Sequence, residues 1–349
     1  MKSRFVLKSR DAAESLYVGH NRALVALAEK NPKIVSCYGD FGPGQVGEVF
    51  QKQFPDRIID VGIAEGHLIT SAAGLADAGF IPFTHCHALF ALGRGYNQIR
   101  QNIAYDNRNA KVVLCNAGVA WGGIGPSHLS VEDMAALRAV PNLVFLSPAD
   151  AVAAEKATIA AAEYNGPVIL RLPSVLDKHP LLYSPELKFE IGKAICLQDG
   201  ADATILATGI MVALALAAAE ALAAKDGIHV RVLDVHTIKP LDARAVLSAA
   251  RETGALVTVE DGNILGGLGG AVAELTAEKW PVRVRRVGVK DEFGESGTPA
   301  SILEYCGLTV SAIQNAVREV VKAKSGTSTA KKAKPAAAKK RKAPPKRGR

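Results

Sequence analysis

The chain has 349 residues, 48% of them hydrophobic, which is enough for two or three domains with sizeable cores. Its formal charge of +8 is unevenly distributed, because the segment from Lys322 onward carries twelve Lys or Arg residues and no acid, which leaves −4 for residues 1–321. The charge therefore gives no support for a nucleic-acid-binding fold in the body of the chain.

Cysteine usage and hydropathy exclude two further classes. The five cysteines are scattered without a Cys-x-x-Cys pair, which argues against a structural zinc site and suits a reducing compartment. No apolar run reaches the roughly 18 residues of a membrane span, and the N-terminus lacks the apolar core of a signal peptide. We expect a cytoplasmic protein that does not contact membranes.

The first elements alternate between helix and strand. Apolar residues recur at helical spacing from Arg10 to Lys30, and Asn31-Pro32 ends this helix before a strand at 34–37. A short strand at 57–61 precedes another helix that runs to Gly79. This alternation predicts an α/β fold with a mainly parallel sheet.

Glu65 lies in the first turn of that second helix. The helix is apolar nearly all round, so we expect it to be buried rather than amphipathic. An acid in a first turn complements the helix dipole and the free amides there. A carboxylate at the mouth of a buried helix must also be paired, protonated or used in chemistry, because an isolated buried charge is costly. Glu65 is therefore the leading catalytic candidate.

The segment Gly62-Ile63-Ala64-Glu65, read with the motifs that follow it, resembles the transketolase family of thiamine diphosphate enzymes. The resemblance implies that Glu65 hydrogen-bonds the aminopyrimidine of thiamine diphosphate and drives its conversion to the imino form, which removes the weakly acidic thiazolium C2 proton. It also implies that Asp40, in the loop after the first strand, faces the thiazolium side; ordinary turn chemistry is the alternative for Asp40.

The next block, from Phe80 onward, is expected to be a strand followed by a helix, and it resembles the segment that forms the pyrimidine pocket. Phe90 matches one aromatic residue of that pocket, and His87 stands where another ring is usual. An imidazole can also stack on a pyrimidine, with a buried structural histidine as the alternative. Arg94 is placed like a substrate-contacting arginine of deoxyxylulose-phosphate synthases, or is a solvated helix charge, and Arg10 is a further expected substrate contact.

A loop at 116–127 lies between a strand at 111–115 and a helix expected from Val131 onward. Its sequence Gly-Gly-Ile-Gly-Pro-Ser-His, ending at His128, resembles the Gly-Pro-Ser/Thr-His turn of the family. The resemblance implies that His128 reaches the donor sugar and the reacting carbon; a capping or surface role is the alternative.

Two positions on the substrate side depart from the family. Ile124 stands where an Asp usually reads a substrate hydroxyl, and Asn116 stands where a His is frequent. Because an apolar side chain cannot accept a hydrogen bond, we expect an unusual or less hydroxylated acceptor rather than the ordinary pentose and hexose phosphates.

The resemblance divides the chain into two α/β domains. We place a transketolase-like pyrimidine-binding domain at 1–175, a linker at 176–193, a transketolase C-terminal-type domain at 194–321 and a disordered Lys/Ala/Pro-rich basic tail at 322–349. The Gly-rich stretch 265–270 lacks the acidic residue that a dinucleotide loop requires about 20 positions later. The tail is either a solubilising extension or a weak, salt-sensitive contact for nucleic acid.

Transketolases hold the cofactor diphosphate through Mg²⁺, on a Gly-Asp-Gly segment and later Asn ligands that this sequence lacks. The resemblance therefore implies no metal ligands here and a partner subunit of the N-terminal, diphosphate-binding type, in an α2β2 assembly. The expected reaction is transfer of a two-carbon ketol unit between a ketose and an aldose, with phosphorylated or otherwise anionic sugars as substrates. A deoxyxylulose-phosphate synthase-like subunit, a 2-oxo acid dehydrogenase beta-like subunit and a non-catalytic scaffold remain as alternatives.

Overall fold

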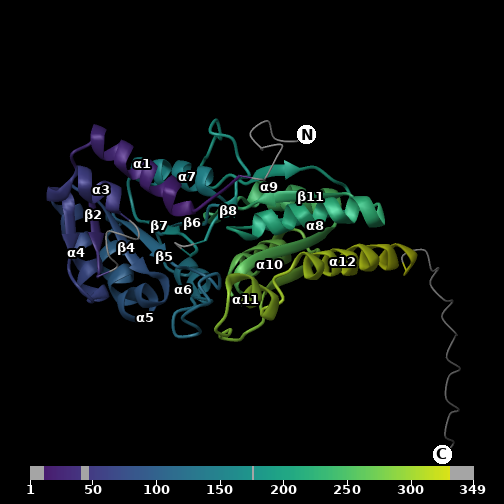
Figure 1. Ribbon diagram of the computed structural model, residues 1–349. Helices are drawn as coiled ribbons and strands as arrows, with labels where there is room; N and C mark the ends of the chain where they lie inside the picture. Colours follow the sequence, from purple (N-terminus) through teal and green to yellow (C-terminus); the bar gives the residue numbers. More distant parts are fainter. Residues whose placement is uncertain (1–11, 41–46, 175–176, 331–349) are drawn as a thin grey trace, which may run out of the picture.

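The computed structural model describes residues 12–40, 47–174 and 177–330, and residues 325–330 are described by their backbone alone. Two α/β units lie side by side, which confirms the predicted fold class. Figure 1 shows the first unit in purple to teal and the second in green to yellow.

The first unit is built on a seven-stranded sheet with the order β12-β6-β7-β5-β4-β2-β3. Six of its strands are parallel, and their interiors are rich in Val, Ile and Phe because helices cover both faces. The parallel strands are β2 (Ile34–Tyr38), β3 (Ile58–Asp60), β4 (Ile81–His87), β5 (Lys111–Cys115), β6 (Val144–Leu146) and β7 (Val168–Arg171).

Two helices cover one face of this sheet and two cover the other. Helices α1 (Leu16–Lys30) and α7 (Ala151–Glu163) run together along the top in Figure 1. They approach closely because Gly19 has no side chain; a Cβ atom there would overlap the carbonyl oxygen of Ala151. On the opposite side lie α4 (Glu65–Asp77) and α5 (Ala88–Gln98), which continues into the π-helix η2 (Ile99–Ala104). The shorter elements are α3 (Glu48–Gln53), η1 (Pro55–Arg57) and α6 (Asp133–Arg138).

The second unit has a five-stranded sheet with the order β14-β13-β10-β11-β9, parallel except for β9. Its strands are β9 (Ile195–Gln198), β10 (Ala203–Ala207), β11 (Val230–Asp234), β13 (Ala255–Asn263) and β14 (Arg283–Val289). Its helices are α8 (Met211–Asp226), α9 (Ala243–Thr253), α10 (Leu268–Lys279), α11 (Pro299–Tyr305) and α12 (Val310–Ala330).

One strand of the second sequence segment joins the sheet of the first unit. Strand β12 (Thr237–Lys239) leaves the second unit and pairs antiparallel with β6. A separate antiparallel pair joins β1 (Ala13–Glu14) to β8 (His179–Pro180), which lies in the segment between the two units. The two units therefore share backbone hydrogen bonds as well as side-chain contacts, which the sequence did not indicate.

Several predicted boundaries were wrong. Helix α1 begins at Leu16 rather than Arg10, because the Ser15 side chain caps it and residues 13–14 form a strand. Helix α6 begins at Asp133 rather than Val131, because Ser130 pairs with Gly118 in an isolated bridge. Helix α12 continues to Ala330, beyond the expected start of the tail.

Two segments also differ in their burial. The expected linker 176–193 is packed over part of its length, with fully buried Leu182 and Tyr183. Helix α4 is not buried all round: His67 and Thr70 are exposed, although the helix begins at a buried Glu65. Gly74 and Asp77 lie exposed on the same side of the helix.

The parallel strands place their carboxyl ends at one edge of the first sheet. The loops after β2, β3, β4 and β5 therefore meet there, where open α/β sheets bind ligands. The candidate site residues in the described part of the first unit lie at these strand ends, in these loops or in the helices that follow them, with Arg94 in the second turn of α5.

Candidate active site

Glu65 is the first residue of α4 and is 6% exposed. The preceding loop turns sharply at Gly62, which has a φ of +70° that a side chain would strain. Among the described residues, the Glu65 carboxylate makes no hydrogen bond, and its Oε2 lies 3.9 Å from Nη1 of Arg94. Arg94 is 62% exposed at its side chain, so solvent screens this pair and the carboxylate remains able to take a stronger partner.

Asp60, at the end of β3, holds two loops of the site together. Its Oδ1 accepts the backbone N–H of Gly62 at 2.9 Å and that of Asp40 at 3.1 Å. Asp40 is exposed and has a φ of +57°, so its backbone follows a left-handed turn. The carboxylate of Asp60 therefore fixes the loop after β2 beside the approach to Glu65.

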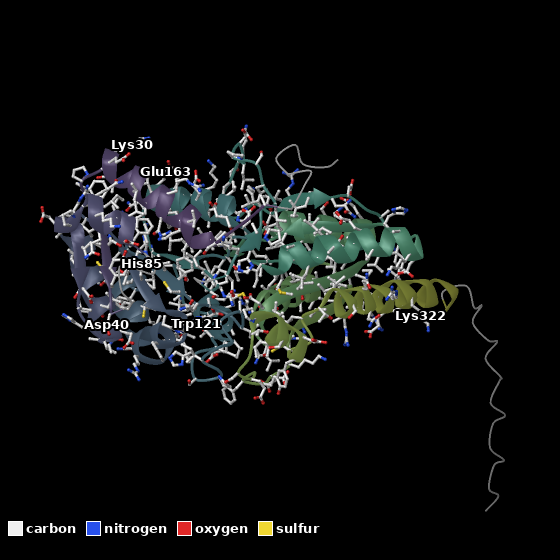
Figure 2. All side chains as sticks on the ribbon, viewed as in Figure 1. Lys30, Asp40, His85, Trp121, Glu163 and Lys322 are labelled. Carbon is white, nitrogen blue, oxygen red and sulfur yellow. The ribbon has the colours of Figure 1, made fainter. Side chains whose placement is uncertain are left out.

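Four rings form a cluster at the same edge. The His87 ring centroid lies 4.9 Å from Phe90, 5.0 Å from Trp121 and 5.3 Å from His128. Phe90 and His128 pack edge to face at 5.2 Å. The cluster joins the end of β4, the first turn of α5 and the loop after β5, and Figure 2 shows Trp121 on the lower side of the first unit.

His87 is buried, and this burial, reinforced by His128, lowers its pKa to about 4. The imidazole is therefore neutral near pH 7 and presents an uncharged aromatic face. This state suits the expected stacking role better than a charged ring would.

Arg94 connects the carboxylate and the ring cluster. Its guanidinium carbon lies 5.3 Å from the centroid of the Phe90 ring, while its Nη1 faces Glu65. The geometry thus brings together three residues that the sequence separates by up to 29 positions. An exposed guanidinium at this edge can attract an anionic ligand group.

The loop after β5 begins with a buried residue in a left-handed conformation. Asn116 has a φ of +54°, and its backbone N–H donates to Tyr17 Oη at 3.1 Å. The Tyr17 hydroxyl in turn donates to the carbonyl of Pro173 at 3.1 Å. One phenol from α1 thus fixes the loops that follow β5 and β7.

The far part of this loop carries the other predicted substrate-side residues. The His128 backbone N–H donates to Gly125 O at 2.9 Å, and its Nδ1 lies 2.8 Å from Ser127 Oγ. Ile124 is 47% exposed and lies on the same turn. Arg10 lies outside the described residues.

Sequence reasoning missed Trp121, Asp60 and Tyr17. The adjacent Trp121-Gly122-Gly123 could have drawn attention, since a large ring beside glycines in a loop at a strand end is a common binding element. Asp60 and Tyr17 act through backbone groups of other segments, and no local motif marks such contacts.

The Gly-rich stretch before α10 does not offer a phosphate site. The buried Glu260 carboxylate accepts the N–H groups of Leu268 and Gly269, both at 2.8 Å, and so occupies the N-terminus of α10. Burial raises the pKa of Glu260 to about 7. The chain's own carboxyl group thus takes the place that a dinucleotide phosphate would need.

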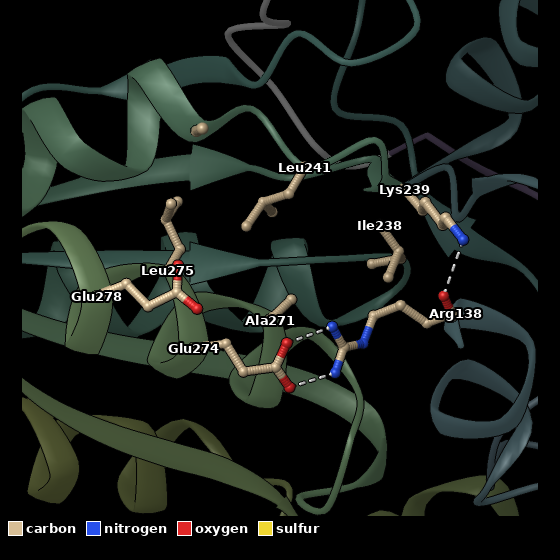
Figure 3. Close-up of a pocket in the computed structure, with 9 residues that line it drawn as sticks. Arg138, Ile238, Lys239, Leu241, Ala271, Glu274, Leu275 and Glu278 are labelled. Carbon is tan, nitrogen blue, oxygen red and sulfur yellow. Dashed lines mark hydrogen bonds and ion pairs between the residues drawn. The ribbon is translucent and has the colours of Figure 1, made fainter. Parts of the chain in front are cut away.

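A pocket of about 340 Å³ lies between the two units, away from the ring cluster (Figure 3). Its polar groups bind one another: Arg138 pairs with both carboxylate oxygens of Glu274, at 2.8 and 2.6 Å. Lys239 donates to the carbonyl oxygens of Arg138 and Val140. These contacts serve to join α6, β12 and α10.

Two further features are absent from the described residues. No group of three or more His, Cys, Asp or Glu side chains in this part of the chain is arranged to hold a metal ion. No helix found there has the length and apolar character needed to cross a membrane.

Comparison with protein-family models gives two matches. Residues 17–176 match the model described as transketolase, pyrimidine binding domain, and residues 192–313 match transketolase, C-terminal domain.

Curated relatives are similar over most of the chain. A 6-deoxy-6-sulfo-D-fructose transketolase subunit of Clostridium sp. (strain MSTE9) is 42% identical over 86% of this chain and 93% of its own length. A putative transketolase C-terminal section of Methanocaldococcus jannaschii is 38% identical over 87% of this chain and 95% of its own length. The 1-deoxy-D-xylulose-5-phosphate synthase of Syntrophotalea carbinolica is 36% identical over 84% of this chain, which spans only 46% of that enzyme.

Two solved structures have the same fold. A split-gene transketolase, titled an inactive beta4 tetramer, has a TM-score of 0.82 and 40% identity, covering 89% of this chain and 99% of that one. Transketolase from Campylobacter jejuni has a TM-score of 0.75 and 22% identity, and the match covers 89% of this chain and 47% of that enzyme.

Proposed function

The chain belongs to the transketolase family, and from this membership we propose that it supplies the pyrimidine side of the active site in a split, thiamine diphosphate-dependent transketolase. The observation that carries the proposal is the placement of the buried Glu65 carboxylate beside the ring cluster. A carboxyl group able to share a proton with a ring nitrogen and a set of aromatic faces are the two features that an aminopyrimidine requires.

The described residues fit this half of the cofactor. Glu65 is shielded from water, makes no hydrogen bond among the described residues and has only a long, screened ion pair with Arg94. It can therefore accept a new partner without first breaking a strong contact. The neutral His87 adds no positive charge beside a ring that would itself become protonated.

In this proposal each side chain has a definite task. Bound thiamine diphosphate would supply a carbanion equivalent at its thiazolium C2. Glu65 would hold a proton at the pyrimidine nitrogen, and the rings of Phe90, His87 and Trp121 would fix the orientation of the pyrimidine and exclude water. His128 would contact the donor sugar at the reacting carbon, and Asp40 would face the thiazolium side.

We propose that the diphosphate and Mg²⁺ are held by a separate subunit of the N-terminal transketolase type, in an α2β2 assembly in the cytoplasm. Two similarities support this: the chain covers nearly the whole of a relative named as a subunit, and nearly the whole of a split-gene transketolase chain. That solved chain is titled inactive as a tetramer of one kind of subunit.

The substrates in this proposal are anionic sugars. The exposed Arg94 at the mouth of the site would attract a phosphate or sulfonate, and the 42% identical relative is named for a sulfonated fructose. Ile124 and Asn116 favour an acceptor with fewer hydroxyl groups to be recognised at this loop. We expect Arg94 and Arg10 to act in attracting the anionic group.

The test is reconstitution. The chain alone should bind thiamine diphosphate poorly and transfer no ketol unit, and activity should appear when the N-terminal-type partner and Mg²⁺ are added. Mg²⁺-dependent turnover by the purified chain alone would overturn the two-subunit proposal.

A second candidate reaction has support from the synthase relatives at 36% identity. A deoxyxylulose-phosphate synthase joins pyruvate to an aldose phosphate with loss of carbon dioxide, whereas ketol transfer releases none. Supplying the assembled enzyme with pyruvate and glyceraldehyde 3-phosphate, and measuring carbon dioxide, separates the two.

A further inference from the structure

The loop that carries Trp121 and His128 is supported by the second unit as well as by the first. Gly297 donates its backbone N–H to Gly122 O at 3.0 Å, and Asn263 donates to Val131 O at 2.7 Å. Residues 294–302, named here the positioning segment, therefore lie against a loop of the other unit.

The contact is closest at two glycines of the loop. A Cβ atom at Gly122 would overlap Ile302 Cγ1 and lie 2.9 Å from the carbonyl oxygen of Gly297. A Cβ atom at Gly125 would overlap the hydroxyl of Ser296. Three of the residues between Trp121 and His128 are glycines, and the two that face the positioning segment have no room for a side chain.

Gly123, between these two glycines, does not face the positioning segment. No atom lies within 4 Å of a Cβ built on it. One side of the loop is thus pressed against the second unit, and the residue between the contacts faces open space.

The base of the loop is fixed to the second unit by buried charges. Arg171, at the end of β7, binds Asp133 of α6 and Asp261 of β13, both at 2.7 Å. A Cβ atom at Gly118, where the loop closes by pairing with Ser130, would overlap Oδ2 of Asp261 in the second unit and lie 2.7 Å from Nη2 of Arg171. Both the base and the outer turn of the loop therefore contact groups of the second unit.

From these contacts we infer that the positioning segment of the second unit sets the placement of Trp121 and His128, and so affects turnover at a site to which this chain contributes side chains from its first unit. The inference rests on the proposed function for its effect on catalysis. Ile302, Ser296 and Gly297 are positioning residues in this account, since each acts through the loop. The C-terminal-type domain thus has a role in the reaction beyond stabilising the fold.

The test uses Trp121 as a probe in the isolated chain. The sequence contains two tryptophans, so replacing Trp280 with Phe leaves Trp121 as the sole indole. In that background Gly122→Ala should displace the loop and increase quenching of Trp121 by acrylamide. The matched control is Gly123→Ala, which adds the same methyl group in open space and should leave the quenching unchanged.

A compensating change tests whether the contact itself is responsible. Ile302→Ala removes the closer of the two contacts of the new Cβ and leaves the one with the Gly297 carbonyl, so the double variant Gly122→Ala/Ile302→Ala should return the quenching of Trp121 part of the way toward that of Ile302→Ala alone. A melting temperature for each variant separates a displaced loop from a loss of global stability. If Gly122→Ala does not fold, Ser296→Val serves as the second variant: Ser296 is exposed, and the larger side chain would contact Gly125 and should likewise increase the quenching of Trp121.

In the enzyme assembled with its partner subunit, Gly122→Ala should lower kcat about tenfold, since small misplacements of catalytic groups have effects of this size or larger. Gly123→Ala should retain the wild-type kcat. Equal quenching and equal kcat for the two glycine variants would overturn the inference. Absence of turnover in every chain, wild type included, would instead contradict the proposed function, while the Trp121 measurements would still decide the role of the segment.

Discussion

Arg171 and Asp261 form an ion pair at 2.7 Å between β7 of the first unit and β13 of the second, and both side chains are almost fully buried. Burial would lower the pKa of Arg171, but Asp133 and then Asp261 together raise it above its usual value. Two carboxylates thus share one guanidinium in a site without solvent. Such a cluster depends on every member, because any unpaired charge there would have no water to stabilise it.

Arg171→Met should therefore reduce the free energy of unfolding by about 3–5 kcal/mol, as expected when a buried pair loses one partner. Urea denaturation of the isolated chain measures this loss. The control is Glu274→Gln, which removes an exposed partner of Arg138 between the same two units. That change should cost less than about 1 kcal/mol. Similar losses for the two variants would contradict the assignment of the buried cluster as the principal polar contact between the units.

Ile124→Asp tests the basis of acceptor choice. Restoring a hydrogen-bond acceptor on the His128 loop should improve kcat/KM for ordinary aldose phosphates by the equivalent of about 1.5–3 kcal/mol, the scale of a hydrogen bond to a charged group. Leu265→Asp is the control, because Leu265 has a similar exposure of 49% but lies on the second unit. Wild-type enzyme that already uses ribose 5-phosphate at rates typical of transketolases would refute the explanation.

The sequence identified candidate site residues only where short local motifs mark them. Glu65 at a helix start, Phe90 one turn after a strand and His128 behind a Gly-Pro turn all follow from short motifs, and the structure places them at one sheet edge. Trp121 was missed because its contact with His87 crosses from one strand end to another, and its contact with His128 depends on how the loop after β5 folds. Spacing along the chain carries no information about such contacts.

The fold shows the same limit. The alternation of strands and helices predicted an α/β fold and the family resemblance predicted two units, but the transfer of β12 to the first sheet depends on a tertiary contact with β6. The expected burial of α4 was wrong because one side of the helix, which carries His67, Thr70 and Asp77, is exposed. The composition of this helix did not show that one of its sides is exposed.

The basic tail should be dispensable for catalysis. Because α12 extends to Ala330 and Lys324 donates to the carbonyl oxygen of Asp202, the truncation is best made after Ala330 rather than near Lys324. The truncated chain should assemble and turn over as the full chain does, and should lose any salt-sensitive retention on heparin. A marked loss of activity would mean that residues 331–349 contribute to the assembled enzyme.

Two buried histidines should make stability depend on pH. His20 and His85 share a hydrogen bond between their Nε2 atoms at 2.9 Å, and His85 lies in the interior of the first unit in Figure 2. Burial lowers the pKa of His85 to about 4, and burial together with His85 lowers that of His20 well below its usual value. Both rings are therefore neutral in the folded chain over a range in which they would be charged when unfolded.

Since the folded pKa values are lowered, the contribution of these histidines is complete above about pH 6.5 and is lost as the pH falls from there toward 4. His20→Gln should remove one such group and make the free energy of unfolding fall less steeply over this range, by about 1.4 kcal/mol per pH unit. The measurement compares urea denaturation of the variant and wild type at several pH values. Parallel curves would show that His20 takes up a proton equally well in both states.

The central claim is that Glu65 acts on a bound aminopyrimidine, and Glu65→Gln tests it. The amide retains the size of the side chain, so the assembled enzyme should form and melt like the wild type, but it cannot exchange a proton with the ring nitrogen. If Glu65 only complemented the helix dipole, Glu65→Gln would lower the free energy of unfolding by about 0.3–1 kcal/mol and leave the reaction unaffected.

The decisive measurement is hydrogen–deuterium exchange at the thiazolium C2 of thiamine diphosphate bound to the assembled enzyme. The account predicts that exchange in Glu65→Gln falls far below the wild-type rate at an unchanged melting temperature. Exchange in Glu65→Gln at the wild-type rate would contradict it.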